Sequence, residues 1–402
     1  MAEKLALDGG KPVRSKERFL VFGAPLIEEE DIQEVVECLK SGWIGTGPRA
    51  HRFESDFAAF KGKKCAVALH SCTAALHLSM LASGVKQGDE VISTPMTFCA
   101  TINSIIHCGA TPVLADCERS TFNIDPRRIE EKITPKTKAI LVVHFAGRCC
   151  NMDEILKLAR SYDLMVIEDC AHAIEAEYHG RKAGTDGDIG CFSFYVTKNV
   201  TTGEGGMVVT DDERIANRIK IIGLHGMAKD AWKRFSDEGY RHYEVIHAGF
   251  KYNMMDIQAA LGIHQLKRVE RCWLRRAEIW QKYNEAFRHL PCILPAEPEP
   301  DTRHAYHLYT PLIDIERLGK SRDWVLDALA AENIGVGVHY LPVHIHPFYR
   351  RMLGWKKGDY PNSEWIGERT ISLPLSPAMS DEDVNDVITA FTKVLKGGAK
   401  WA

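Results

Sequence analysis

The sequence has no long run of one charge and no apolar run that could cross a bilayer. Its 51 basic and 54 acidic residues give a net charge of −3 and are mixed along the chain, which argues against a nucleic-acid or membrane-surface partner. The longest apolar stretches, such as 139–143, are strand-sized, whereas a membrane span needs roughly 20 residues. The first residues are polar and charged, unlike a secretory leader. We therefore expect a cytoplasmic protein.

The cysteines have no regular spacing. The chain contains 12 of them, and the adjacent pair Cys149 and Cys150 is not accompanied by a C-x₂-C motif. A disulfide framework and a zinc site are therefore both disfavoured, and we expect buried, reduced thiols and no metal. Internal repeats and low-complexity segments are also lacking.

Strand-like and helical segments alternate between residues 65 and 211. The strand-like segments are 65–71, 90–95, 111–117, 138–145, 165–170, 189–194 and 205–211, and the helical ones are 73–83, 97–108, 126–133 and 151–162. Apolar runs with little alternation are typical of strands covered on both faces. The pattern predicts an α/β domain with a mostly parallel, seven-stranded sheet between helices. Because the last three strands lack long intervening helices, one of them is free to run antiparallel.

The C-terminal part has a different pattern. A long helical segment, 255–289, is followed by a proline-rich connector over 291–307. Beyond it we expect a smaller α+β domain, with strands at 307–314 and 336–342 and helices at 321–333 and 381–396. We divide the chain into a large domain, 1–265, and a linking helix with a small domain, 266–402.

Chemically useful side chains follow the ends of the expected strands. In an open α/β sheet, ligands bind where the strands have their carboxyl ends. The residues at these ends are Ser71, Cys72 and Thr73, then Phe98, then Asp169 and His172, and finally Ser193 and Lys198. Lys198 precedes a glycine-rich turn, 203–206. A lysine, a carboxylate, an imidazole, small hydroxyls and an aromatic ring are thus predicted to share one edge.

Pyridoxal 5′-phosphate would use all of these groups. Its aldehyde forms a Schiff base with a lysine, here Lys198, and its pyridine nitrogen needs a carboxylate, here Asp169. Ser71, Cys72 and Thr73 begin a helix that can hold the phosphate, with help from Ser193. Phe98 would stack on the ring, and His172 would contact its other face or its phenolic oxygen.

Each residue also has a simpler explanation. Lys198 alone could be a surface lysine, and Asp169 a helix N-cap. Residues 71–73 could be an ordinary helix start, while Phe98 and His172 could belong to the core. The prediction depends on their joint order at successive strand ends.

Longer motifs resemble the DegT/DnrJ/EryC1/StrS family of sugar-nucleotide aminotransferases. They include "SFYVTKNVTTGEGGMVVTDD", "HSCTAALHLSMLA" and "YNMMDIQAALGIHQL", and the likeness covers nearly the whole chain. The resemblance implies fold type I of pyridoxal-phosphate enzymes and a homodimer whose subunits share each active site. Lys251 and Asn253 would then approach the cofactor phosphate of the neighbouring subunit. Family members often have glutamine at the position of His172.

The resemblance also implies an activity. The enzyme would move an amino group from glutamate or glutamine to a keto group of a nucleotide-linked sugar, in polysaccharide or related biosynthesis. Several stretches favour the subset resembling UDP-4-amino-4-deoxy-L-arabinose aminotransferase, and hence C4. Substrate contacts are expected from Thr46, Gly47 and Pro48 and from His339 and Tyr340.

Four alternatives remain open from the sequence. The enzyme could aminate C3, act on a cyclic polyol ketone, or be a pyridoxal-phosphate sugar dehydratase. Lys198 favours transamination over dehydration, because dehydratases of this family have histidine instead. A non-catalytic protein on the same fold would be expected to lack Lys198 or Asp169.

Overall fold

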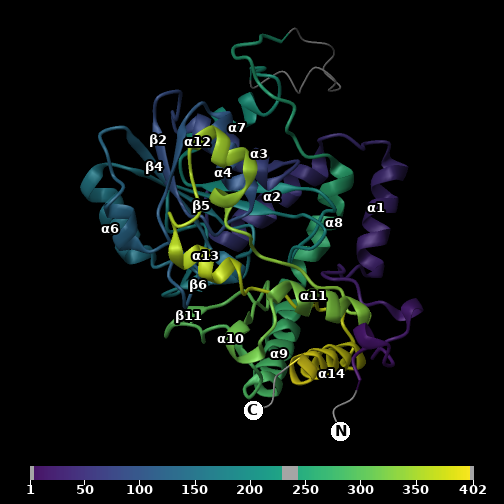
Figure 1. Cartoon of the computed structure of the whole chain (residues 1–402). Coiled ribbons are helices and arrows are strands. Elements are labelled where there is room, and N and C mark those ends of the chain that lie inside the picture. The colour runs from purple at the N-terminus through teal and green to yellow at the C-terminus, as the bar shows by residue number, and fades with distance from the viewer. Residues whose placement is uncertain (1–3, 229–242, 399–402) are drawn as a thin grey trace.

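A seven-stranded sheet forms the centre of the molecule (Figure 1). The computed structural model describes residues 4–228 and 243–398. The strand order is β1-β9-β8-β5-β4-β2-β3. Their bounds are β1 (Cys65–Leu69), β2 (Glu90–Ser93), β3 (Thr111–Leu114), β4 (Thr137–Val143), β5 (Met165–Asp169), β8 (Ile189–Ser193) and β9 (Gly206–Thr210). Only β9 runs antiparallel to its neighbours in this sheet, so the predicted fold class and the expected antiparallel strand are confirmed.

Helices cover both faces of the sheet, which explains why its strands are mainly apolar, with little alternation. One face packs against α3 (Cys72–Ala82), α4 (Cys99–His107) and α7 (Glu213–Ile222). The other face packs against α2 (Pro48–Lys61), α8 (Asp256–Lys267) and α6 (Met152–Tyr162). Successive strand residues point to opposite faces, as Val67 and Ala68 show by joining different apolar clusters.

The C-terminal part has its own apolar core. This core joins α9 (Val269–Phe287), α11 (Arg322–Ala331) and α14 (Asp381–Gly398), and Leu5 from the N-terminal segment also packs there. Figure 1 shows these helices together at one end of the molecule, below the sheet. The division at residue 265 remains our proposal. The remaining helices and strands are α1 (Glu29–Ser41), α5 (Pro126–Glu130), β6 (Glu177–Tyr178), β7 (Arg181–Lys182), β10 (Cys292–Ile293), β11 (Thr302–Arg303), β12 (Leu312–Ile313), α10 (Ile315–Leu318), α12 (Pro347–Leu353) and α13 (Pro361–Gly367).

Three expected elements of this part differ from the prediction. The long helix is two helices, α8 and α9, separated at Arg268. The expected strand 307–314 is reduced to β12. The expected strand 336–342 is irregular, because its backbone makes one isolated bridge, between Gly337 and Ser372, rather than a continuous ladder.

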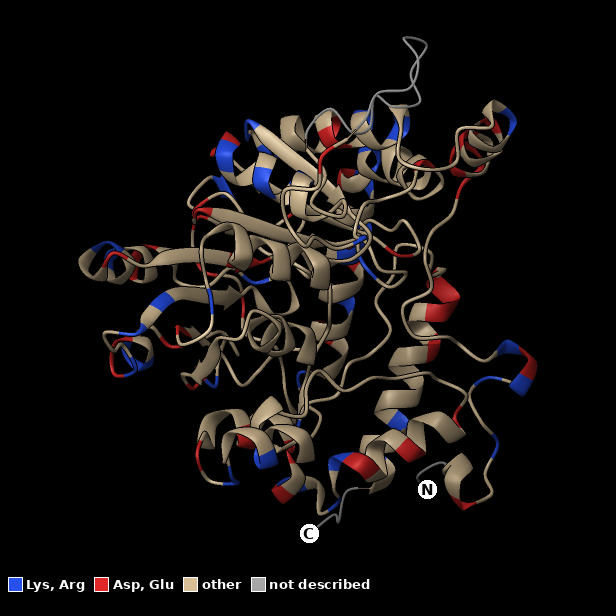
Figure 2. Ribbon diagram, turned by 90° about the horizontal axis from the view of Figure 1, so that it is seen from above, with Lys and Arg blue, Asp and Glu red and all other residues tan. Residues whose placement is uncertain are grey.

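The surface charges and the cysteines agree with the sequence. Figure 2 shows basic and acidic residues mixed along the outer helices, while the central strands carry few of either. All twelve cysteines are free thiols, and each is buried or half-buried. Among the described helices, none combines the length and the apolar character that a bilayer crossing requires.

Candidate active site

A pocket of about 630 Å³ opens at the carboxyl ends of the parallel strands. Ten of the fifteen site residues predicted from the sequence line it: Ser71, Cys72, Thr73, Phe98, Asp169, His172, Ser193, Lys198, His339 and Tyr340. They come from the starts of α3 and α4, the ends of β5 and β8, and the C-terminal part of the chain. The alignment of strand ends, which the alternation of strands and helices predicts, is what brings them together.

Lys198 lies in the turn that follows β8. Its backbone N–H donates to the carbonyl oxygen of Tyr195 at 2.9 Å, which closes the turn. Burial lowers the pKa of the Lys198 amine from 10.5 to about 8, although Cys72 and Asp169 act in the opposite direction. A lysine with this pKa is partly neutral near neutral pH, so it can act as a nucleophile or accept a proton.

Asp169 is the last residue of β5 and is 5 % exposed. One carboxylate oxygen accepts the backbone N–H of Ala171 at 3.1 Å, and the other accepts the hydroxyl of Thr101 at 2.8 Å. Burial raises the pKa of Asp169, while these two hydrogen bonds and the charge of Lys198 lower it. The result is an oriented carboxylate in the pocket wall, suited to bind a protonated ring nitrogen.

The N-terminus of α3 forms a second wall. Ser71 is its N-cap, and its hydroxyl oxygen accepts the backbone N–H of Ala74 at 3.1 Å. The N–H groups of Cys72 and Thr73 belong to the first helical turn, where no intrahelical acceptor exists, so they can bind an anion.

The glycine-rich turn allows β9 to approach this helix. A Cβ atom on Gly206 would overlap the carbonyl group of Ser71 and lie 2.6 Å from the nitrogen of Cys72. A larger residue would therefore push the helix start away from the strand. This close approach explains why glycines follow Lys198 in the sequence.

His172 is held in one tautomer by its neighbours. Its Nδ1 accepts the backbone N–H of Ala146 at 3.2 Å, so the proton of the neutral ring is on Nε2, which lies 3.1 Å from the hydroxyl oxygen of Tyr340. Burial and the charge of Lys198 lower the pKa of His172 well below its usual value. The imidazole is therefore neutral.

Two further side chains face the pocket mouth. Phe98 is 58 % exposed, and its ring centre lies 6.2 Å from that of Tyr340. His339 pairs with the hydroxyl of Ser372 at 2.7 Å and stacks on Phe22, and burial lowers the pKa of His339 to about 3. The aromatic ring of Phe98 and the neutral imidazole of His339 thus line the same pocket as Lys198.

Five predicted residues lie outside the pocket lining of the same chain. Thr46 donates to the carbonyl oxygen of Met254 and accepts from Asn253, each at 2.5 Å. Gly47 and Pro48 begin α2, where Asp256 accepts the N–H of Gly47 at 2.7 Å. Lys251 is exposed, and its backbone forms an isolated β-bridge with Leu224. The structure therefore does not place Thr46, Gly47, Pro48, Lys251 or Asn253 beside Lys198 of their own chain.

A family model identifies the family of the chain. The model for the DegT/DnrJ/EryC1/StrS aminotransferase family matches residues 25–392. The chain belongs to this aminotransferase family. It is a pyridoxal-phosphate-dependent enzyme, and the resemblance inferred from the motifs is confirmed.

Individual relatives support the assignment over the full length. The chain is 50 % identical to the spore coat polysaccharide biosynthesis protein SpsC of Bacillus subtilis over 386 residues, which are 96 % of this chain and 99 % of SpsC. A Streptococcus pneumoniae protein assigned as a sugar aminotransferase, solved in its PLP form, is 32 % identical with a TM-score of 0.87, covering 95 % of this chain and all of the other. DesI, solved with its TDP-sugar product, is 30 % identical with a TM-score of 0.86, covering 98 % of this chain and 97 % of DesI.

The residues of this aminotransferase fit pyridoxal phosphate. The carboxylate of Asp169 is ready for a ring cation, and the amine of Lys198 has a lowered pKa. Because Gly206 has no Cβ atom, the start of α3 at Ser71 can lie directly against β9. These three features match the three functional groups of the cofactor, namely its nitrogen, its aldehyde and its phosphate.

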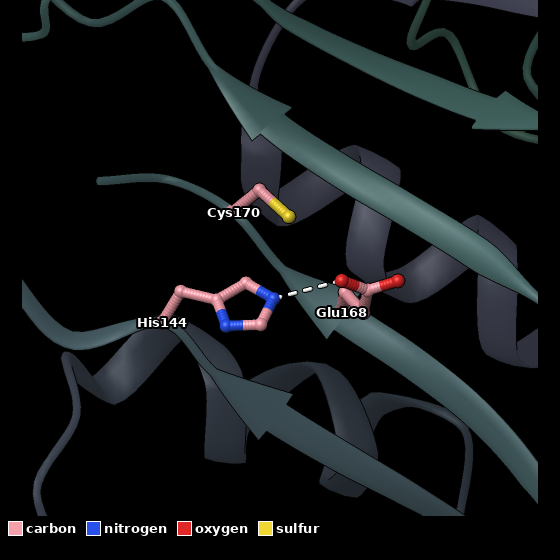
Figure 3. Close-up of side chains that lie close together, drawn as sticks. All are labelled: His144, Glu168 and Cys170. Carbon is pink, nitrogen blue, oxygen red and sulfur yellow. Dashed lines mark hydrogen bonds and ion pairs between the residues drawn. The ribbon is translucent and has the colours of Figure 1, made fainter. Parts of the chain in front are cut away.

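A second buried cluster lies behind the pocket of the aminotransferase. His144, Glu168 and Cys170 place one ligand-type atom each within 4.8 Å of one another (Figure 3). The ring nitrogens of His144 are used by Glu168, at 2.8 Å, and by the N–H of Cys150, at 3.1 Å. Glu168 also accepts the N–H groups of Gly184 and Gly187, and burial raises the pKa of the Cys170 thiol. These hydrogen bonds brace the end of β5, and we assign no metal to them.

Sequence reasoning missed several residues that line the pocket. They are Thr97, Thr101, Tyr195, Thr197 and Glu204. A signal existed for two of them, because Thr97 and Thr101 are one helical turn apart in the expected helix 97–108. The other three lie between β8 and β9, where the backbone is irregular and the sequence shows neither a helical nor a strand period.

Proposed function

We propose that the enzyme transfers the amino group of glutamate, or of glutamine, to the C4 keto group of a nucleotide-linked sugar. The observation that carries this proposal is the presence of Lys198 and Asp169 in one pocket of a DegT-family aminotransferase. The TDP-sugar product of DesI supports a nucleotide-linked acceptor, and the name of SpsC supports a role in polysaccharide biosynthesis. The stretch 225–232 also favours the C4 subset, and part of it lies outside the described residues.

Each residue of the pocket has a proposed task. When bound, pyridoxal phosphate supplies an electron sink next to the carbon that carries the amino group. The neutral Nζ of Lys198 accepts the proton from the Cα of the donor, and in the second half-reaction it moves the proton to C4 of the sugar. Asp169 keeps the ring nitrogen protonated. The start of α3 binds the phosphate, with the hydroxyls of Ser71, Thr73 and Ser193.

The remaining walls position the ring and the sugar. With the cofactor bound, Phe98 would stack on one face of its ring. The neutral imidazole of His172 contacts its other side without adding a charge that would compete with Lys198. Tyr340, which is next to His172, and His339 offer polar groups to the acceptor sugar.

The proposal includes a homodimer with shared active sites. Lys251 is exposed, and Thr46 and Asn253 are hydrogen-bonded to each other outside the lining of their own pocket. Their positions suit a contact with the cofactor phosphate and the substrate of a neighbouring subunit. A cationic Lys251 would neutralise part of a phosphate dianion. Gly47 and Pro48 come directly after Thr46 in the sequence and would lie at the same interface.

The first experiment tests the amino-transfer chemistry. The purified enzyme is mixed with glutamate or glutamine without acceptor, and the yellow absorbance of the bound cofactor is recorded. Transamination predicts loss of the colour and release of a 2-oxo acid. Lys198→Ala should lose the covalently bound chromophore, whereas Lys86→Ala, at an exposed lysine that does not line the pocket, should keep it. Retention of the colour with both donors would argue for the dehydratase.

The second experiment identifies the acceptor. The enzyme is first treated with its amino-group donor until the yellow colour is lost. It is then mixed separately with UDP-, dTDP- and GDP-linked 4-keto sugars, a 3-keto sugar nucleotide and a cyclic polyol ketone. Return of the yellow colour marks an acceptor, and NMR of the product locates the new amine. Amination at C3, or of the polyol alone, would replace the C4 proposal.

A further inference from the structure

We propose that Thr97 and Thr101 form a directed hydrogen-bond relay that orients the Asp169 carboxylate and keeps it ionised for the cofactor. The inference rests on the proposed role of Asp169 and assigns positioning residues to it. Both threonines line the pocket, Thr97 just before α4 and Thr101 within its first turn.

The direction of the relay follows from counting hydrogens. The hydroxyl of Thr101 donates to Oδ2 of Asp169 at 2.8 Å, since a carboxylate can only accept. Thr101 has a single hydroxyl proton, so the contact of 2.7 Å between the two threonine hydroxyls is donated by Thr97. The order is therefore Thr97 to Thr101 to Asp169.

The relay is buried along its whole length. Thr97 and Thr101 are 2 % and 1 % exposed, so water cannot replace either hydroxyl easily. Hydrogen bonds that end on a charged group are stronger than neutral ones, and a chain of two donors polarises the last bond further. The other carboxylate oxygen is fixed by the N–H of Ala171. The thiol of Cys72 also donates to this second oxygen, at 4.0 Å. With donors on both oxygens, the carboxylate can rotate little.

The same short segment also carries Phe98. The backbone N–H of Thr101 donates to the carbonyl oxygen of Phe98 at 3.2 Å, which fixes the first turn of α4. The proposed stacking ring and the proposed carboxylate anchor therefore belong to one rigid unit. The position of Phe98 over the ring and the orientation of Asp169 toward the ring nitrogen therefore depend on the same segment.

The test measures the titration of Asp169 in the full-length protein without cofactor, by ¹³C NMR of labelled aspartate carboxyl groups, assigned with Asp169→Asn. Thr101→Val keeps the shape of the side chain and removes the hydroxyl. We expect it to raise the pKa of Asp169 by roughly one to two units, because a hydrogen bond to a charged group is lost. Thr101→Ser keeps the hydroxyl and should restore the titration. The titratable groups that also act on Asp169 are unchanged in both variants: Lys198, His144, Cys72, Tyr340, Cys170 and Cys191.

Two further variants separate the relay from a general packing effect. Thr97→Val does not touch Asp169, and it should shift the titration in the same direction by less. Ser104→Ala removes a buried hydroxyl of the same helix that donates to the carbonyl oxygen of Thr101, and it should leave Asp169 unchanged. Three results would each overturn the relay. The pKa of Asp169 could be unchanged in Thr101→Val, it could stay raised in Thr101→Ser, or it could shift in Ser104→Ala as much as in Thr101→Val. None of these results depends on the identity of the sugar or on turnover.

Discussion

Breaking the buried ion pair between Arg276 and Glu175 should destabilise the enzyme strongly. Both side chains are 1 % exposed, and the pair connects α9 to the loop after β5. Glu175 also accepts the side-chain N–H of Asn199 at 2.7 Å, and Asn199 follows Lys198 directly. The pair therefore links the helix at the start of the C-terminal part to the turn that carries the lysine.

The cost depends on which partner is removed. Arg276→Met leaves the carboxylate of Glu175 buried with one hydrogen-bond donor, and removing one member of a buried pair costs about 3–5 kcal/mol. Replacing both members in Glu175→Gln/Arg276→Met leaves no buried charge, so we expect a cost of about 1–2 kcal/mol from altered hydrogen bonds. The double variant should thus be more stable than Arg276→Met alone, even though it carries one change more.

Urea unfolding followed by circular dichroism, with holoenzyme at one cofactor concentration, measures Arg276→Met, Glu175→Gln and the double variant, which together with the parent complete a double-mutant cycle. The coupling between the two sites should exceed about 1 kcal/mol. Arg276→Lys serves as a control, because it keeps the charge and loses the planar hydrogen-bonding geometry. If Arg276→Met unfolds at the same urea concentration as the parent, or if the double variant is the least stable, the ion pair does not have the energetic role assigned to it.

Three other predictions concern the pocket. Gly206→Ala should displace the start of α3 at Ser71 and weaken cofactor binding about tenfold or more, as a titration of the apoenzyme with pyridoxal phosphate would show. Because the neutral amine of Lys198 forms as pH rises through about 8 rather than 10.5, the rate of cofactor capture should increase up to about pH 8 and then level off, and a rise that continues to pH 10 would contradict this. Between about pH 8 and 10.5 the stability contribution of Lys198 should increase with pH, since the folded protein has released this proton there while the unfolded chain still holds it. Tyr340→Phe removes the partner of His172 and should lower kcat/KM for the sugar half-reaction about tenfold while leaving glutamate turnover nearly unchanged, which stopped-flow absorbance can separate.

The large domain could be predicted well because its signals are local. Strands such as β4 are buried on both faces, so their sequences are apolar with little alternation, and the first four strands are each followed by a helix before the next strand. The carboxyl ends of such strands meet at one edge by geometry alone. This is why Lys198 and Asp169, 29 positions apart, could be placed in one pocket from the sequence.

The C-terminal part was harder because its order comes from tertiary contacts. The segment 336–342 has the composition of a strand, yet its backbone pairs only through Gly337 and Ser372, so composition alone gave the wrong element. The break between α8 and α9 at Arg268 lacks proline and glycine, the usual signals for a helix end. Hydroxyl relays such as Thr97 and Thr101 are equally hard to anticipate, since a threonine in a helix looks the same whether it faces a carboxylate or a leucine.

The antiparallel strand β9 has a consequence for how the enzyme is made. Ser71 and Lys198 become neighbours only when Gly206–Thr210 pairs with β1 on one side and β8 on the other. A nascent chain that ends before this strand has a lysine and a helix start but no geometry that joins them. The vitamin-derived group can therefore be captured only after roughly the first half of the polypeptide has left the ribosome, and a translational pause upstream of β9 would leave the emerging protein unable to acquire it.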